Sequence, residues 1–240
     1  MNILYGISIS GDASEFPALS AIRCVELPGS RLTEPGFSLP SALRGKKIFV
    51  SNREDQRFFR TLPEVGTGVR QEFFRLCTRR GAAAAALNAE GFSLALDPEE
   101  ADSLRSELGV ICGIAEKYRL PLTLEIRIPG SAADPEVFYR LKHRLLYPAR
   151  TLCALHPHEA GALEAAEKFV ASCPFDCDLF RIGFDAAAGN YLSEKLWERL
   201  LKLVRPAGRR IPVVIFDPGS GADRSVYAEL DRLAELGMKA

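Results

Sequence analysis

Several short apolar runs in this chain end in side chains that can bind, ionise or ligate. Residues 121–130 show the pattern most clearly, because Glu125 and Arg127 lie inside the β-prone segment 122–128 just before Pro129 and Gly130. An ionised group is costly to bury without a partner or a task. The other residues of this kind at or near segment ends are Ser8, Glu26, Asn52, Glu90, His156, His158, Arg181, Asp185 and Asp217. We therefore predict a polar site where such ends meet.

These residue types allow particular chemistry. Arg127 and Arg181 could each clamp a phosphate or carboxylate, because the guanidinium fork matches these groups bidentately. His156 and His158 share one tripeptide beside Glu159, and imidazole serves both acid–base chemistry and metal binding. Two structural alternatives stay open. Glu26 and Glu125 could form ion pairs with Arg127 or Arg181, and Asp217 could bond its own following backbone in a turn.

Eight short segments have the composition and length of strands. They are residues 2–10, 23–29, 46–52, 82–87, 122–128, 151–155, 178–185 and 210–217. Helical or irregular segments separate them, with strong helix starts at Asp97-Pro98 and Asp134-Pro135. Strands separated by helices favour parallel pairing. The pattern predicts an α/β protein, a (β/α)8 TIM barrel forming a single domain over residues 1–240, with its site at the C-terminal strand ends. A doubly wound open sheet is the alternative, although no Gly-x-Gly-x-x-Gly motif follows the first segment.

Composition limits the partners. The 240 residues carry 31 basic and 31 acidic side chains, so net charge provides no attraction for nucleic acid or an anionic membrane. No apolar run approaches the roughly 20 residues that span a bilayer. The six scattered cysteines favour reduced, buried thiols, and we expect a cytoplasmic protein that binds a small molecule. The sequence leaves open whether the chain forms a homo-oligomer.

The chain resembles the xylose isomerase-like TIM barrels, the sugar phosphate isomerase/epimerase superfamily, along most of its length. The resemblance rests on the opening strand at residues 3–8, the phrase Cys24-Val25-Glu26-Leu27, the helix and strand of residues 114–125, the segment at 155–158, and Phe216-Asp217. It implies a carbohydrate-metabolism enzyme that moves a proton beside a carbonyl. The divalent metal would be Mn, Zn or Mg, and imidazole ligands would favour a transition metal over Mg²⁺.

Carried over position by position, the resemblance implies roles for individual residues. Glu125 and Asp217 become the catalytic carboxylates, and Glu125, His156, His158 and Asp217 become the metal ligands. The remaining strand-end residues are expected to bind substrate: Glu26, Asn52, Glu90, Arg127, Arg181 and Asp185.

The sequence also departs from the family. Only Glu125 matches the usual ligand set by type, and Arg181 places positive charge where a cation is expected. A second hypothesis is therefore a metal-free, catalytically degenerate barrel that binds a phosphorylated or carboxylated metabolite. A phosphodiesterase acting on DNA is disfavoured, because three histidines and zero net charge do not supply its metal cluster and basic groove.

Overall fold

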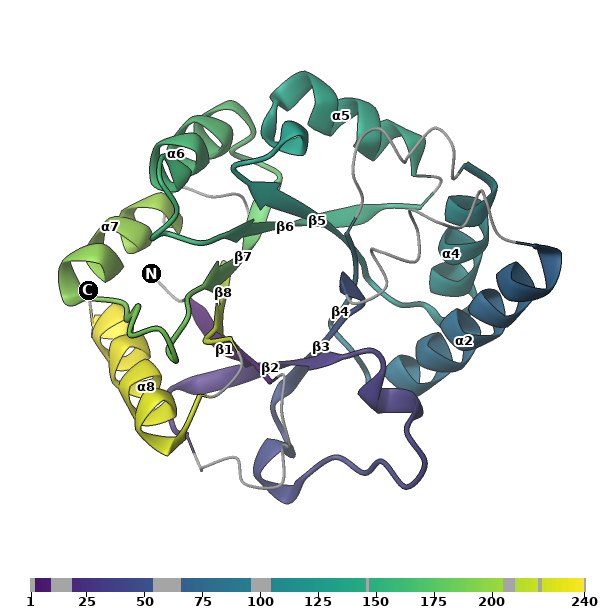
Figure 1. Ribbon diagram of the computed structural model, residues 1–240, viewed down its shortest axis with the longest axis horizontal. Helices are drawn as coiled ribbons and strands as arrows, with labels where there is room; N and C mark the ends of the chain where they lie inside the picture. The colour runs from purple at the N-terminus through teal and green to yellow at the C-terminus, as the bar shows by residue number, and fades with distance from the viewer. Residues whose placement is uncertain are drawn as a thin grey trace.

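Eight parallel strands close into one barrel in a computed structural model, which describes residues 3–9, 19–53, 66–95, 105–145, 147–204, 210–219 and 222–239 (Figure 1). The strands are β1 (Leu4–Ser8), β2 (Ile22–Pro28), β3 (Lys47–Ser51), β4 (Gly91–Ala95), β5 (Leu122–Ile128), β6 (Ala149–Leu155), β7 (Cys177–Gly183) and β8 (Val213–Asp217). They pair in sequence order, and β8 returns to β1. The predicted (β/α)8 barrel is confirmed, and the open-sheet alternative is excluded by the β1–β8 pairing.

Helices surround the ring of strands (Figure 1). They are α2 (Thr67–Ala86), α4 (Arg105–Tyr118), α5 (Pro135–Arg144), α6 (Ala162–Ser172), α7 (Glu194–Val204) and α8 (Arg224–Lys239), with 3-10 turns η2 (Arg31–Thr33), η3 (Ser41–Leu43) and η6 (Ser131–Ala133). The predicted start of α5 is confirmed, because the Asp134 carboxylate accepts hydrogen bonds from the backbone N–H groups of Glu136 and Val137 at 3.0 and 3.1 Å. The predicted start at Asp97 lies outside the described residues. No helix in the described ranges has the length and apolarity needed to cross a bilayer.

The predicted strand at residues 82–87 is wrong. Helix α2 continues through Ala86, and the strand is the next segment, Gly91–Ala95. Alanine has the highest intrinsic helix propensity, and here it prevails over the fit of small side chains to an inner strand. Gly81 also suits the helix: a Cβ on it would lie only 2.7 Å from Ile114 Cγ2, so α2 and α4 approach closely there.

Strand register decides which side chains share the barrel interior. Residues opposite one another in neighbouring strands point the same way, and Ser8 pairs with Glu26, Ala95 with Glu125, Ala154 with Arg181, and Gly183 with Asp217. An apolar cluster fills the interior nearer the N-terminal ends of the strands: Leu4, Cys24, Phe49, Leu152, Leu179, Val213 and Ile215. The polar C-terminal ends, called here the mouth, therefore lie above a packed plug.

The last two helices stabilise the closure of the barrel. The Asp231 carboxylate of α8 accepts hydrogen bonds from the backbone N–H groups of Ala21 and Ile22, at 2.8 and 3.1 Å, where β2 begins. The Trp197 indole N–H of α7 donates to the Leu233 carbonyl at 2.8 Å. Residues from both ends of the sequence are thus fixed against one another.

Candidate functional site at the barrel mouth

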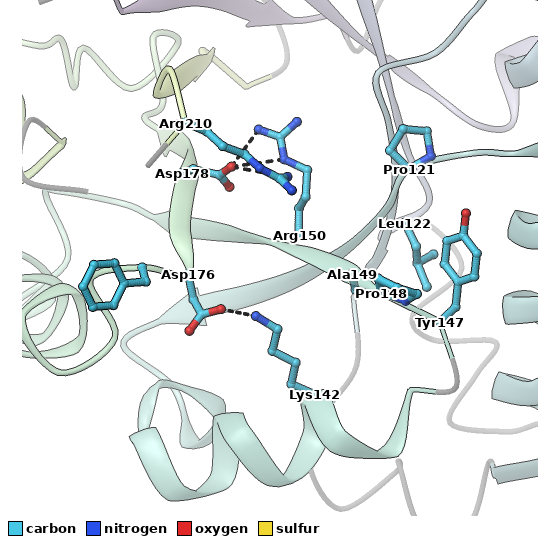
Figure 2. Close-up of a pocket in the computed structure, with 11 residues that line it drawn as sticks. Pro121, Leu122, Lys142, Tyr147, Pro148, Ala149, Arg150, Asp176, Asp178 and Arg210 are labelled. Carbon is cyan, nitrogen blue, oxygen red and sulfur yellow. Dashed lines mark hydrogen bonds and ion pairs between the residues drawn. The ribbon is translucent and has the colours of Figure 1, made fainter. Parts of the chain in front are cut away.

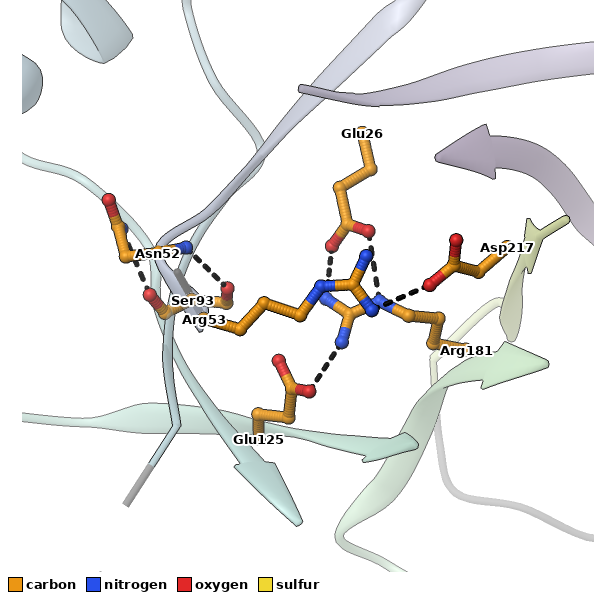
Figure 3. Close-up of polar contacts among 7 residues, drawn as sticks. All are labelled: Glu26, Asn52, Arg53, Ser93, Glu125, Arg181 and Asp217. Carbon is orange, nitrogen blue, oxygen red and sulfur yellow. Dashed lines mark hydrogen bonds and ion pairs between the residues drawn. The ribbon is translucent and has the colours of Figure 1, made fainter. Parts of the chain in front are cut away.

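Arg181 of β7 occupies the centre of the mouth, between two carboxylates (Figure 3). Its Nε donates to Glu26 Oε2 at 2.9 Å, and its Nη2 contacts Glu26 Oε1. On its other side, Nη1 lies 2.5 Å from Glu125 Oε1 of β5. The side chains of Arg181 and Glu26 are 2% exposed and that of Glu125 is 10% exposed, so the three groups form a buried ion triad. The alternative that Glu26 and Glu125 pair with Arg181 is the arrangement that the structure shows.

The triad keeps its central charge. Burial by itself would lower the pKa of the Arg181 guanidinium, but the carboxylates of Glu125 and Glu26 outweigh burial and raise that pKa above its usual value. Arg181 therefore stays a cation at any working pH. Fixed positive charge holds both glutamates in place across the width of the barrel.

A second ion pair lies at the same mouth. Arg53 Nη1, just after β3, lies 2.6 Å from Asp217 Oδ2 at the end of β8. The Arg53 side chain is 36% exposed and the Asp217 side chain only 7%. Solvent therefore reaches the guanidinium of this pair more readily than its carboxylate. Figure 3 shows Arg53 and Arg181 extending toward each other from opposite sides of the barrel. Asp217 Oδ1 also accepts a long bond of 3.4 Å from the Gly219 N–H, as expected for a turn.

Glu125 Oε2 in the mouth is buried and lacks a hydrogen-bond donor within the described residues. Asn52 Oδ1 is also buried without a donor, but it lies against Gly29, beside Arg80 of α2. Asn52 is itself held by β4, because its Nδ2 donates to the Ser93 carbonyl at 3.0 Å and its backbone N–H lies 3.4 Å from Ser93 Oγ. A buried acceptor without a donor is costly, which makes Glu125 Oε2 a candidate for binding a substrate hydroxyl group.

Three predicted substrate-binding residues have other surroundings. Arg127 is exposed and lies 3.6 Å from Glu159, while Asp185 is exposed and accepts a hydrogen bond from the Ala188 N–H in its own loop. The placement of Glu90 at a C-terminal strand end is wrong. Glu90 precedes β4 and pairs with Lys47 at the start of β3, at 3.1 Å, because residues 82–86 belong to a helix and the strand begins after Glu90.

The four predicted metal ligands do not come together. His156 and His158 are exposed, and the His156 ring lies against Gly183, where a Cβ would come within 2.6 Å of Nδ1. Glu125 is bound to Arg181, and Asp217 is bound to Arg53. In the ranges that the structure describes, no three His, Cys, Asp or Glu side chains are grouped to hold a metal. A guanidinium between the two glutamates does not fit a divalent cation beside them, since like charges repel.

No family model matches this sequence, and no curated protein matches it. Several solved structures do match the fold of this chain. A D-psicose 3-epimerase from Clostridium cellulolyticum H10, solved with D-tagatose, is 14% identical, with 99% of this chain and 97% of that chain covered and a TM-score of 0.57. A D-tagatose 3-epimerase-like protein is 13% identical with the same coverage and a TM-score of 0.65. A xylose isomerase domain protein from Alicyclobacillus acidocaldarius is 14% identical, with 98% and 99% covered and a TM-score of 0.62.

The resemblance to xylose isomerase-like barrels is confirmed as a likeness of fold. At these sequence identities the comparison does not assign a role to any individual residue of this chain. The residues of this mouth must therefore be interpreted from their own contacts.

Sequence reasoning missed two members of the site, Arg53 and Ser93. Arg53 follows Asn52 directly, so an ion-pairing residue beside a predicted strand end was available as a signal. Ser93 is the single polar residue inside the run Gly91-Phe92-Ser93-Leu94-Ala95, which has the length of a buried strand. Ser93 was obscured by placing the fourth strand one segment too early.

Proposed function

We propose that this protein is a sugar or sugar-phosphate isomerase/epimerase that moves a proton beside a carbonyl without a divalent metal at its mouth. The observation that carries the proposal is the Arg181 guanidinium between Glu26 and Glu125, in the centre of the mouth. The named activities of two solved structures with this fold, D-psicose 3-epimerase and D-tagatose 3-epimerase-like, support the reaction class.

The mouth offers separate groups for each part of the reaction. Glu125 Oε2 has no donor within the described residues, and Asp217 approaches from β8, so two carboxylates are available to exchange protons with a substrate. One takes the proton from the carbon beside the carbonyl, and the electron pair moves to the carbonyl oxygen. The exposed N–H groups of Arg53 stabilise that oxygen as it becomes negative. Return of a proton to the opposite face of the same carbon gives the epimer. For the isomer, the negative oxygen takes the proton of the neighbouring hydroxyl group, whose oxygen becomes the new carbonyl, and a proton returns to the former carbonyl carbon.

Deuterium exchange tests this proposal. Chelator-treated protein is incubated in D2O with D-tagatose, D-psicose and their phosphate esters, and proton NMR follows loss of the signal beside the carbonyl. We expect exchange to survive chelation and to fall about 100-fold or more in Glu125→Gln and Asp217→Asn, as for loss of a general base. Glu198→Gln, on the exposed surface of α7, is the control and should behave as the wild type. Exchange that appears only after Mn²⁺, Zn²⁺ or Mg²⁺ is added contradicts a metal-free mouth.

A second candidate is a binding protein that has no catalytic step. It is favoured by one observation: Arg181 and Arg53 already hold carboxylates, and of these two guanidinium groups Arg53 is the more accessible to a phosphate. Sugar phosphates would then raise the melting temperature of the wild type but not of Arg53→Gln, and no deuterium would enter any sugar. That pair of results would replace the enzyme by the binding protein.

A further inference from the structure

A cavity of about 450 Å³ lies at the opposite end of the barrel, where β5, β6 and β7 begin (Figure 2). We call it the basal cavity. Its lining includes the segments just before or at the start of these strands, together with Lys142 of α5 and Arg210. A volume of this size suits a small organic molecule. The mouth residues do not contribute to it.

The charges of the basal cavity are unbalanced. Among the described residues, three cationic side chains line it, Lys142, Arg150 and Arg210, against two carboxylates, Asp176 and Asp178. The chain as a whole has zero net charge, so the excess of one positive charge is local. A monoanionic group would neutralise it.

Two guanidinium groups converge on a single carboxylate oxygen. Arg150 donates to Asp178 Oδ2 through Nε and Nη2, at 3.3 and 3.0 Å, and Arg210 Nη1 lies 3.8 Å from the same oxygen. The Arg210 contact is too long for a hydrogen bond, and its side chain is 65% exposed. Arg150 thus holds Asp178 in place, and Arg210 presents its N–H fork at the edge of the cavity.

The remaining acid is already neutralised by its own neighbours. Asp176 pairs with Lys142 and also accepts a hydrogen bond from the Tyr139 hydroxyl at 3.1 Å. It therefore does not compete with an incoming anion for Arg210. Figure 2 shows the Lys142–Asp176 pair on one side of the cavity and the Asp178 cluster on the other.

The wall between the charges is apolar. Pro121, Leu122, Pro148 and Ala149 line the cavity together with Tyr147. The ring of Tyr147 gives a surface on which a planar group can stack. The cavity thus combines a cationic fork with flat apolar surfaces.

We propose that the basal cavity binds a small organic anion with a flat, apolar body, whose carboxylate or phosphate is held by Arg210 beside Arg150. Bidentate pairing of an arginine with such a group gives both affinity and orientation. Tyr147 and the proline-rich wall cover the body of the ligand. This site is independent of the proposed activity at the mouth.

Isothermal titration calorimetry with four probes tests the proposal: phenyl phosphate, benzoate, inorganic phosphate and benzyl alcohol. We expect saturable binding of one aromatic anion per chain, weaker binding of inorganic phosphate, and none of the neutral alcohol. Phenyl phosphate and benzoate distinguish a phosphate ligand from a carboxylate ligand. Failure of both aromatic anions to bind, or equal binding of benzyl alcohol, overturns the proposal.

Matched variants locate the binding. Arg210→Gln should weaken the aromatic anion about tenfold or more, since a charge-assisted hydrogen bond is lost, while Asp178 keeps its bonds to Arg150 and the fold is retained. Tyr147→Ala should weaken the aromatic anion and leave inorganic phosphate unchanged. Arg75→Gln is the control, because Arg75 is exposed on α2 and has one ion pair of 3.4 Å with Glu72. Equal losses in Arg75→Gln and Arg210→Gln would overturn the assignment, and Glu125→Gln at the mouth should bind as the wild type.

Discussion

At the scale of single residues, the mouth depends on Arg181. A guanidinium and two carboxylates removed from water have lost most of their hydration, which their mutual attraction and hydrogen bonds must offset. Such a triad adds little net stability as a whole, but each member becomes indispensable to the other two. Removing the cation would leave Glu26 and Glu125 buried without a counter-charge.

Arg181→Met should therefore lower the free energy of unfolding by about 3–5 kcal/mol, the cost of breaking a buried pair. Urea unfolding followed by circular dichroism measures it. Arg199→Met is a matched control, because Arg199 also holds two glutamates, Glu164 and Glu167, at 2.9 and 3.0 Å, but on the surface. That change should lower the free energy of unfolding far less, because water screens exposed ion pairs. Equal losses in the two variants would show that the triad is not buried in solution.

A rescue separates lost charge from lost packing. Adding Glu26→Gln and Glu125→Gln to Arg181→Met removes the unpaired charges, so the triple variant should recover much of the stability that the single variant loses. If it stays as unstable as Arg181→Met, the loss comes from the shape of the side chain instead of its charge.

At the scale of elements, glycines in neighbouring helices have opposite surroundings. A Cβ on Gly81 of α2 would come within 2.7 Å of Ile114 Cγ2, whereas a Cβ on Gly113 of α4 would meet nothing within 4 Å. Alanine is favoured over glycine in a helix interior by about 1 kcal/mol when space permits. Replacing glycine by alanine should thus change the stability of the protein in opposite directions at these two positions, although the two helices pack together.

We expect Gly113→Ala to raise the midpoint of thermal unfolding by a few degrees and Gly81→Ala to lower it. The first gains helix propensity on an exposed face, and the second forces α2 and α4 apart, which offsets the same gain. Differential scanning calorimetry of the two variants gives both signs. A rise in both would mean that the helices separate without cost.

The elements also show what sequence patterns can predict. The segments at 122–128 and 151–155 were identified because apolar runs of strand length are bounded by breakers. The strand predicted at residues 82–87 was wrong because the helix propensity of alanine and the fit of small side chains to an inner strand gave opposite indications. A single sequence does not show which of the two prevails. Glu90 was misplaced for that reason alone.

At the scale of the whole molecule, the contacts of the mouth depend on barrel closure. Glu26 and Arg181 are 155 positions apart, and Arg53 and Asp217 are 164 apart. A sequence shows that such residues end their strands, but register and closure decide which of them touch. From the sequence alone, the pairing of Glu26 and Glu125 with Arg181 was therefore one alternative among several. The register of the strands in the closed barrel shows which pairing forms.

All six cysteines lie inside the closed structure. Burial raises the pKa of the Cys24 thiol to about 11, so at pH 8 it stays protonated and unreactive, since the thiolate is the nucleophile. We expect iodoacetamide to label native protein slowly at all six positions and to label every thiol in strong denaturant, as counted by mass spectrometry. Rapid native labelling of Cys24 would show that the barrel opens near β2.

The pairing of β8 with β1 has a consequence for synthesis on the ribosome. Val213, which pairs with Leu4, is made more than 200 residues later, so β1 keeps one unpaired edge throughout that interval. At ordinary translation rates of about 5–20 residues per second, the delay is on the order of 10 to 40 s. The bonds from Asp231 to Ala21 and Ile22 form later still. Nascent chains of this protein thus lack the partner of one edge of β1 for most of their synthesis, and an unpaired edge is a template for pairing with another chain.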